Sequence, residues 1–331
     1  MKFEEPGSAV NAVAPSNVPQ RPTWSVMVPA YRPSDLLREA LLSARVSLDA
    51  AGIDAQVEVV DDASPDLDVE ALVRSWAIPG IEVHRRPANG GLGTCWNTCI
   101  ERARGELIHI LHQDDLVKKA FYEHMARAAR NYPHAGMIFC RTELLDTSGS
   151  ELAELEQPNE GVIEEDWLVR ITQGQRLQCP SVVMRRDTYR RVGGFAPELR
   201  YVVDWEMWVR VAANGPVVYV PEPLAIYRIH EGAETRQIKS AGVVTKDMLA
   251  GLQRIKVTLK KAGRLDCVGF ATAYAAGVSG AAVFEAQRAN AMRIAAKEFW
   301  ASMRHFGPLM GLRWMYWHSR RFADVWLKAV L

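Results

Sequence analysis

The segment from residue 24 to residue 141 alternates between short apolar, β-branched runs and stretches with helical spacing, and this alternation constrains the fold most. Between the first two runs, Leu37, Leu41, Ala44 and Leu48 recur at intervals of four, three and four residues, which places them on one helix face. The runs themselves lie at 24–30, 57–62, 81–85, 106–115 and 137–141. Strands that alternate with helices pair in parallel, so we expect an α/β sandwich with a mostly parallel central sheet flanked by helices.

Unusual residues lie where these predicted strands end. In open α/β sheets, ligands bind at the carboxyl ends of the strands. The residues found there are Pro29, Ala30 and Tyr31, then Asp61 and Asp62, then the segment 89–93, and finally Asp114 and Asp115. The sequence therefore predicts a binding site at this edge of the sheet.

Two pairs of acids stand out within that group. Asp61 and Asp62 precede the turn 63–65, where a carboxylate can accept hydrogen bonds from a nucleobase or ribose, or cap the following helix. Asp114 and Asp115 end an apolar strand, where a charge is unfavourable unless it is paired or bound to a metal. Carboxylates together with phosphate oxygens suit Mg²⁺ or Mn²⁺, although a helix cap for the residues after 115 is the alternative.

The glycine-rich segment Asn89-Gly90-Gly91-Leu92-Gly93 follows the third predicted strand and precedes a predicted helix at 94–104. Glycines let a backbone approach a ligand closely, and the N–H groups at a helix start can bind phosphate. No Gly-Lys-Ser/Thr follows, and Trp96 stands where a dinucleotide fingerprint has its third glycine. A P-loop is therefore excluded, and a nicotinamide dehydrogenase is disfavoured.

The second half of the chain is less regular. A strand is predicted at 181–186, a helix at 204–214, two short strands split by prolines at 217–230, and only helices from about 240 onward. Asp204 and Glu206 lie among large apolar residues, a setting that can tune a carboxylate as a general base, although Asp204 can also cap the helix. His230 is either a metal ligand or a structural group.

These elements, in this order, resemble family 2 glycosyltransferases, which have the GT-A fold. The resemblance runs from about Trp24 to His230. It is carried by SVMVPAYRP, VEVVDDASPD, ANGGLGTCWN, GELIHILHQDD, the stretch 193–215 and the tetrapeptide YRIH.

The resemblance implies a role for each matching residue. Asp114 is implied as the principal metal ligand, with His230 as a second, and Asp204 as the general base. Asp62, or failing that Asp61, is implied to bond the base, and Trp205 and Glu206 to lie next to the acceptor. The implied nucleotide contacts are Pro29, Ala30, Tyr31, Asp61, Asp62, Asn89, Gly91, Gln113 and Asp114. Two positions depart from the family pattern, because His112 replaces the first acid of the metal motif and Val203 replaces the acid before Asp204.

The function implied is inverting transfer of a sugar from a nucleoside diphosphate sugar, by default a UDP-sugar, to a carbohydrate or lipid-linked acceptor. Mn²⁺ or Mg²⁺ is the implied cofactor, and cell-surface polysaccharide or glycolipid synthesis the implied process. Two alternatives stay open. One is a catalytically degenerate nucleotide-binding scaffold, suggested by the departures at His112 and Val203. The other is a sugar-phosphate nucleotidyltransferase, although MVPAYRP lacks the glycine-rich basic loop expected there.

Three regions are expected along the chain: a disordered tail at 1–22, a catalytic domain at 23–235 and a helical region at 236–331. The net charge of +1 argues against a nucleic-acid partner, and the five cysteines form no CxxC pair, which favours reduced thiols in the cytoplasm. No signal peptide and no run of 18 uncharged apolar residues is recognised. Tryptophans and arginines are interspersed over 300–331, which suits a membrane interface on the inner face of the cytoplasmic membrane, or a homodimer contact.

Overall fold

The computed structural model describes residues 22–146, 151–154, 167–230, 232 and 234–307. The chain divides into two compact units. The sheet unit contains the described residues of Met1–Trp167 together with Arg176–Glu198 and Asn214–Ile229. The helical unit contains Leu168–Gln175, Leu199–Ala213 and the described residues from His230 onward. Two internal segments of the predicted catalytic domain, 168–175 and 199–213, and its described residues from 230 to 235 thus fold with the helical unit.

A nine-stranded mixed sheet forms the centre of the sheet unit, in the order β3-β2-β1-β4-β8-β6-β9-β5, with β7 paired to β6. Strands β1, β2, β3 and β4 are mutually parallel, as is the pair β6 and β9, whereas β8 runs antiparallel to both β4 and β6. The α/β prediction is confirmed, but the sheet is mixed because β8 is inserted between β4 and β6 in the opposite direction. The strands are β1 (Trp24–Ala30), β2 (Ala55–Asp61), β3 (Ile81–Arg85), β4 (Leu107–Ile110), β5 (Leu116–Val117), β6 (Met137–Asp146), β7 (Glu151–Glu154), β8 (Val182–Arg185) and β9 (Val217–Ile229).

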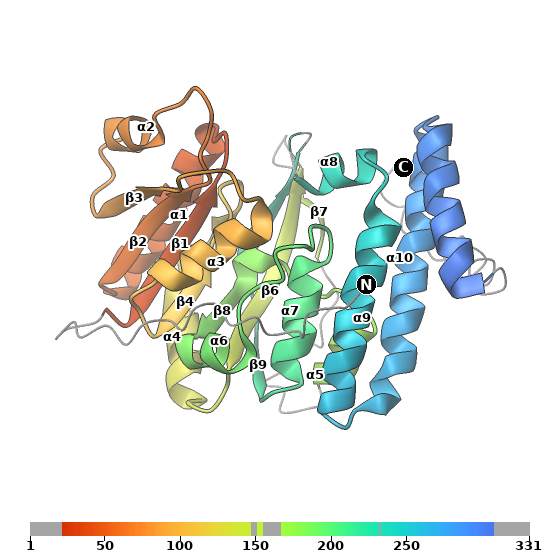
Figure 1. The fold of residues 1–331 in the computed structure, drawn as a ribbon. Coiled ribbons are helices and arrows are strands. Elements are labelled where there is room, and N and C mark those ends of the chain that lie inside the picture. Colours follow the sequence, from red (N-terminus) through yellow and green to blue (C-terminus); the bar gives the residue numbers. More distant parts are fainter. Residues whose placement is uncertain (1–21, 147–150, 155–166, 231, 233, 308–331) are drawn as a thin grey trace. The chain divides into compact units, whose positions relative to one another are not determined.

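Helices cover both faces of the parallel part of this sheet. Helix α3 packs on one face of β1 and β2, and α1 lies on the other (Figure 1). Side chains alternate between the two faces of β1, so that Val26 and Val28 point to the same face. They pack there in a core that also contains Leu37 of α1 and Phe121 of α4. The helices of this unit are α1 (Asp35–Ala51), α2 (Val69–Ser75), α3 (Leu92–Arg102), α4 (Phe121–Asn131) and α6 (Arg186–Val192), with a short 3₁₀ turn at Cys179–Ser181.

Two strands differ from their predicted extent in ways that matter for the site. The strand expected over 106–115 ends at Ile110, the chain turns at 112–115, and residues 116 and 117 form β5 against β9. The acids of this motif therefore lie in a turn between strands and do not cap a helix, since α4 begins only at Phe121. The two strands expected over 217–230 are one strand, β9, whose prolines lie where its register against β6 shifts.

Helices make up the second unit, as predicted for the chain beyond residue 240. They are α5 (Trp167–Thr172, whose first residue belongs to the sheet unit), α7 (Val203–Ala212), α8 (Glu234–Ser240), α9 (Val244–Lys261), α10 (Val268–Arg288) and a further helix over 292–307, with a 3₁₀ turn at Leu265–Cys267. Helix α9 packs on both α7 and α10. The predicted tail lies almost wholly outside the described residues, as does the segment 308–331.

Within the described residues, one helix, Leu265–Arg288, has the length and composition needed to cross a membrane, with a mean hydropathy of 1.5. However, 44% of its most apolar window is buried, and the core helix of a soluble protein has the same composition. No run of 18 uncharged apolar residues was recognised in the sequence, and this helix is the described segment that comes nearest to one. The residues from 267 to 284 carry no charge, and only polar positions such as Thr272 and Ser279 interrupt the apolar pattern.

Candidate functional site

The ends of β1 and β4 are joined by a side chain from the metal motif. Gln113 accepts a hydrogen bond from the backbone N–H of Tyr31 (3.1 Å) and donates one to the Tyr31 carbonyl (3.2 Å). The Tyr31 ring remains 40% exposed, and the Arg32 guanidinium lies 5.5 Å from its centroid. Gln113, predicted as a nucleotide contact, thus uses its amide to hold the two loops together, and Tyr31 presents an aromatic surface beside them.

Asp62, at the end of β2, organises the glycine-rich loop. Its carboxylate pairs with Arg86 and accepts hydrogen bonds from the backbone N–H groups of Gly90 (3.0 Å) and Gly91 (2.9 Å). The Asn89 amide donates to the Asp62 carbonyl (3.1 Å). Gly91 has φ of 76°, which favours glycine, and it is the N-cap of α3. Asp62 therefore fixes the loop that leads into the start of α3.

Asp61 is also engaged with protein donors. Its carboxylate is fully buried and accepts hydrogen bonds from the Ser64 N–H (3.0 Å), the Ser64 hydroxyl (2.6 Å) and the Arg85 guanidinium (2.7 Å). Both carboxylates, of which Asp62 or failing that Asp61 was predicted to bond the base, thus also hold loops of the protein. Ser64, Arg85 and Arg86 were missed; the signals were a serine three residues after Asp61 and paired arginines at the end of β3.

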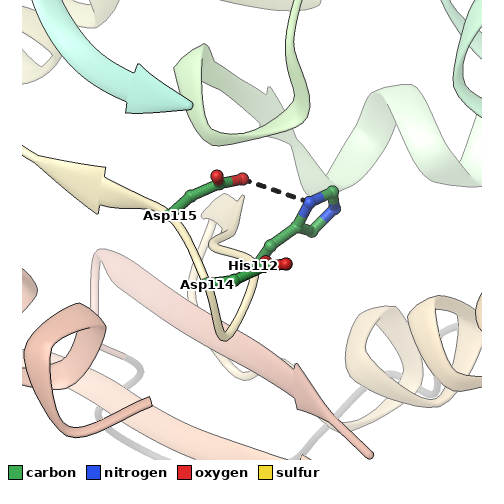
Figure 2. A group of neighbouring side chains, drawn as sticks. All are labelled: His112, Asp114 and Asp115. Atoms are coloured by element: carbon green, nitrogen blue, oxygen red, sulfur yellow. Dashed lines mark ion pairs between the residues drawn. The ribbon is translucent and has the colours of Figure 1, made fainter. Parts of the chain in front are cut away.

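His112, Asp114 and Asp115 form a group of candidate metal ligands in the turn after β4, with one ligand atom from each lying within 4.8 Å of the other two (Figure 2). The Nδ1 atom of His112 lies 3.3 Å from Oδ2 of the fully buried Asp115, the ion pair drawn in Figure 2. Asp115 Oδ1 accepts a hydrogen bond from the Arg228 N–H (3.0 Å), and the Arg228 guanidinium binds the Asp114 carbonyl. Through Arg228, strand β9 therefore holds the turn that contains Asp114 and Asp115.

Burial and charge set the protonation of this group. Burial raises the pKa of Asp115, the His112 imidazole lowers it and the Asp114 charge raises it, and together these effects give a pKa of about 6. Burial disfavours the charged imidazole of His112, but Cys179 and Asp115 outweigh it and hold its pKa well above the usual value. The imidazole also stacks on the Trp96 ring, with centroids 4.9 Å apart. His112, which replaces the usual acid, is thereby fixed between Asp115 and α3.

The chemistry of this group fits a divalent cation. Two carboxylates and an imidazole are ligands that Mn²⁺ accepts, and Mg²⁺ accepts the carboxylates. The carboxylates of Asp114 and Asp115 are neighbours in this turn, and two neighbouring carboxylates favour a cation. Asp114 was predicted as a ligand, whereas Asp115 and His112 join it here. His230 is not a member of this group and belongs to the helical unit.

The predicted base and its neighbours lie in the helical unit. Asp204 is the second residue of α7, and its Oδ2 accepts a hydrogen bond from the Gln175 amide (2.6 Å). Trp205 is 1% exposed and donates its indole N–H to the Ile171 carbonyl (2.7 Å). Glu206 is fully buried and pairs with Arg210 (2.7 Å) and Arg254 (3.6 Å). Trp205 and Glu206, predicted as acceptor contacts, thus lie buried and contact other residues of the helical unit.

Comparison with known proteins identifies the fold and the chemistry. Residues 25–173 match the family described as Glycosyl transferase family 2. Residues 25–173 therefore form a family 2 glycosyltransferase domain. The chain is 27% identical over 253 residues to the uncharacterized protein MT1568 of Mycobacterium tuberculosis (strain CDC 1551 / Oshkosh), covering 70% of this chain and 75% of that protein. It is 25% identical to the uncharacterized glycosyltransferase RT0329 of Rickettsia typhi, over 65% of this chain and 66% of that one.

Solved glycosyltransferase structures share this fold. TarS from S. aureus in complex with UDP-GlcNAc superposes with a TM-score of 0.54 at 15% identity, covering 86% of this chain and 92% of that one. The mannosyltransferase PcManGT from Pyrobaculum calidifontis, in complex with GDP-Man and Mn²⁺, gives a TM-score of 0.51 at 18% identity over 90% and 88% of the chains. At these identities the likeness supports the GT-A fold of this glycosyltransferase.

Proposed function

We propose that this glycosyltransferase moves a sugar from a nucleoside diphosphate sugar to an acceptor hydroxyl with inversion, in the synthesis of a cell-surface polysaccharide or glycolipid. The observation that carries the proposal is the group of His112, Asp114 and Asp115 in a family 2 domain, with His112 stacked on Trp96 of the helix that follows the glycine-rich loop. The donors named for TarS and PcManGT support a nucleotide-sugar, and UDP is our default carrier.

The sheet unit binds the donor. Pro29, Ala30 and Tyr31 line the nucleotide, and the N–H groups at the start of α3, after Gly91, face its phosphates. Asp114 is the principal metal ligand, and His112, Asp115 or His230 completes the set. A bound Mn²⁺ or Mg²⁺ supplies neutralisation of the diphosphate as it leaves.

Asp204 is the general base. It takes the proton of the acceptor hydroxyl while that oxygen forms a bond to the anomeric carbon and the bond to the diphosphate breaks, which inverts that carbon. The Gln175 amide, 2.6 Å from Oδ2 of Asp204, orients the carboxylate. General-base help of this kind contributes about 10²–10⁴ in rate.

Replacement of Asp204 tests this assignment. We expect Asp204→Asn to lower the release of nucleoside diphosphate from UDP-GlcNAc or GDP-Man by about 10²–10⁴-fold, with the nucleotide-dependent rise in melting temperature unchanged. The matched control is Asp266→Asn, an exposed acid of the same unit that pairs with Arg264. Undiminished turnover in Asp204→Asn contradicts the role, and so does lost nucleotide binding in a folded variant. A wild type that binds nucleotide and turns over no donor favours the degenerate scaffold.

We also infer peripheral contact with the cytoplasmic face of the membrane through the end of the chain, residues 300–331. In the described part of this region and just before it, the helix over 292–307 exposes Met292, Phe299 and Trp300. Its exposed charged side chains are Arg293, Lys297 and Arg304, whereas its one acid, Glu298, is buried. Aromatic residues edged by cations suit an anionic interface.

Flotation with anionic vesicles tests the membrane contact. We expect the full chain to float with the vesicles, and Trp300→Ser to float less. Leu265→Ser, which replaces a side chain of similar exposure (66% against 68% for Trp300), should float like the wild type. Equal flotation of all three proteins would contradict a membrane contact through Trp300. Concentration-dependent dimers that are lost in Trp300→Ser would mean that this surface binds a second copy of the chain instead of the membrane.

A further inference from the structure

Helix α7, which carries Asp204, begins without a cap from its own sequence. Its N-cap residue, Val202, has no side chain that accepts a hydrogen bond, and the first N–H groups of a helix need acceptors. Asp247, in the first turn of α9, supplies an acceptor from outside. Its carboxylate accepts hydrogen bonds from the N–H groups of Arg200 (3.1 Å), Tyr201 (2.7 Å) and Val202 (3.1 Å).

The same face of α9 holds this segment by close packing. Gly251 lies one turn after Asp247, and a Cβ at that position would lie 2.5 Å from Cγ2 of Val202 and 3.8 Å from Cδ1 of Leu199. Glycine therefore lets the α9 backbone approach the residues that lead into α7. The Asp247 carboxylate and Gly251 together fix residues 199–202, and both contact Val202.

We propose that Asp247 and Gly251 are positioning residues for the catalytic carboxylate of Asp204, an inference that rests on the proposed role of Asp204 as the base. Asp204 follows Val202 by two residues, so the direction of its side chain depends on where α7 begins. Its two oxygens accept hydrogen bonds from the Trp205 N–H (2.7 Å) and the Gln175 amide (2.6 Å). A shift of the α7 start would misalign both.

A second acid, which is buried, holds α9 itself. Glu298, in the helix over 292–307, is 2% exposed and accepts hydrogen bonds from the N–H groups of Val244 (2.9 Å) and Thr245 (2.8 Å) at the start of α9. Glu298 of the last described helix thus caps the start of α9. Asp247 of α9 in turn binds the N–H groups of the residues that lead into α7. The helical region, which lies outside the family match at 25–173, contributes to catalysis by this route.

The first test separates turnover from donor binding. Asp247→Asn keeps the shape of the side chain but turns an N–H group toward N–H donors, so the start of α7 should move. We expect kcat for donor turnover, measured with UDP-GlcNAc or GDP-Man, to fall about 10²-fold, with the KM for the donor unchanged. Gly251→Ala, which displaces Val202 without touching the carboxylate, should give the same pattern, whereas Asp266→Asn should behave like the wild type.

The second test asks whether Asp247 acts through Asp204. Residues that act as a unit are not additive, so the double variant Asp204→Asn/Asp247→Asn should be no slower than Asp204→Asn alone. A further loss in the double variant, or unchanged kcat in both Asp247→Asn and Gly251→Ala while Asp204→Asn is slow, overturns the positioning role and leaves the base in place. Full activity of Asp204→Asn removes the base, and the positioning role with it.

Discussion

At the scale of single residues, neighbours decide what each strand-end acid does. The carboxylates of Asp61 and Asp62 follow the same strand, and protein donors already bind both. Asp115 pairs with His112, and Asp114 lies half-buried beside it, so that these three side chains bring their ligand atoms together. The same residue type thus supports the loops in one turn and belongs to a group of candidate metal ligands in the other.

Asp62→Asn should destabilise the sheet unit. The change removes the charge that pairs with the largely buried Arg86, whose side chain is 13% exposed, and weakens the bonds to Gly90 and Gly91. Breaking one partner of a buried pair leaves the other uncompensated, so the free energy of unfolding in urea should drop by about 3 kcal/mol. Glu82→Gln, which removes the exposed pair with Arg104, should lower it by less than about 1 kcal/mol. Equal effects would contradict the loop-holding role.

His109 should make stability depend on pH. Burial lowers its pKa from 6.5 to about 3, with the imidazole between the Tyr122 hydroxyl (2.9 Å) and the Pro180 carbonyl (3.0 Å). Below pH 6.5 the unfolded chain binds a proton on this residue that the folded chain does not bind. Its contribution to stability is therefore complete above pH 6.5 and falls by up to about 1.4 kcal/mol per pH unit as the pH drops toward 3.

Urea unfolding from pH 4 to 7 measures this dependence. In His109→Gln, the free energy of unfolding should vary less with pH over that range than in the wild type. The exposed His134→Gln should keep the wild-type pH dependence. An unchanged slope in His109→Gln would mean that the folded protein accommodates a proton at this position.

At the scale of elements, the spacing of apolar residues predicted the regular strands and helices of the sheet unit. It failed where polar turns or prolines interrupt a strand. The run at 24–30 and the face of Leu37, Leu41, Ala44 and Leu48 correspond to β1 and α1. The strand at 106–115 was extended too far, because period alone does not show that His112 and Asp115 close a turn. Pro221 and Pro223 were taken as a break, whereas β9 absorbs them at shifts in its pairing with β6.

Gly105 should tolerate no side chain. It lies between α3 and β4, and a Cβ there would lie 2.4 Å from the Trp24 carbonyl carbon, which belongs to the rigid backbone of β1. Gly105→Ala should therefore lower the free energy of unfolding by about 1–3 kcal/mol. Gly215→Ala, at a position with no atom within 4 Å of the added Cβ, should be neutral or stabilise by about 0.4–1 kcal/mol. Similar melting temperatures for the two variants would contradict this account.

At the scale of the whole molecule, the residues proposed to act in binding and catalysis are divided between the two units. The group at His112, Asp114 and Asp115 belongs to the sheet unit, whereas Asp204 and His230 belong to the helical unit. The resemblance to the family ordered these motifs correctly along the chain. It could not reveal that 168–175 and 199–213 fold with the helical unit, because that depends on contacts between residues far apart in sequence, such as Asp247 with Val202.

The central claim is that Asp114 anchors a metal-dependent nucleotide-sugar site. The most direct test is thermal stability with a panel of nucleoside diphosphates, with and without Mn²⁺, for the wild type, Asp114→Ala and the exposed control Asp49→Ala. A nucleotide at about 100 times its Kd should add about 2.7 kcal/mol. We predict a Mn²⁺-dependent rise in melting temperature with one nucleotide, retained in Asp49→Ala and lost in Asp114→Ala. No rise with any nucleotide, or an equal rise in Asp114→Ala, would contradict the claim.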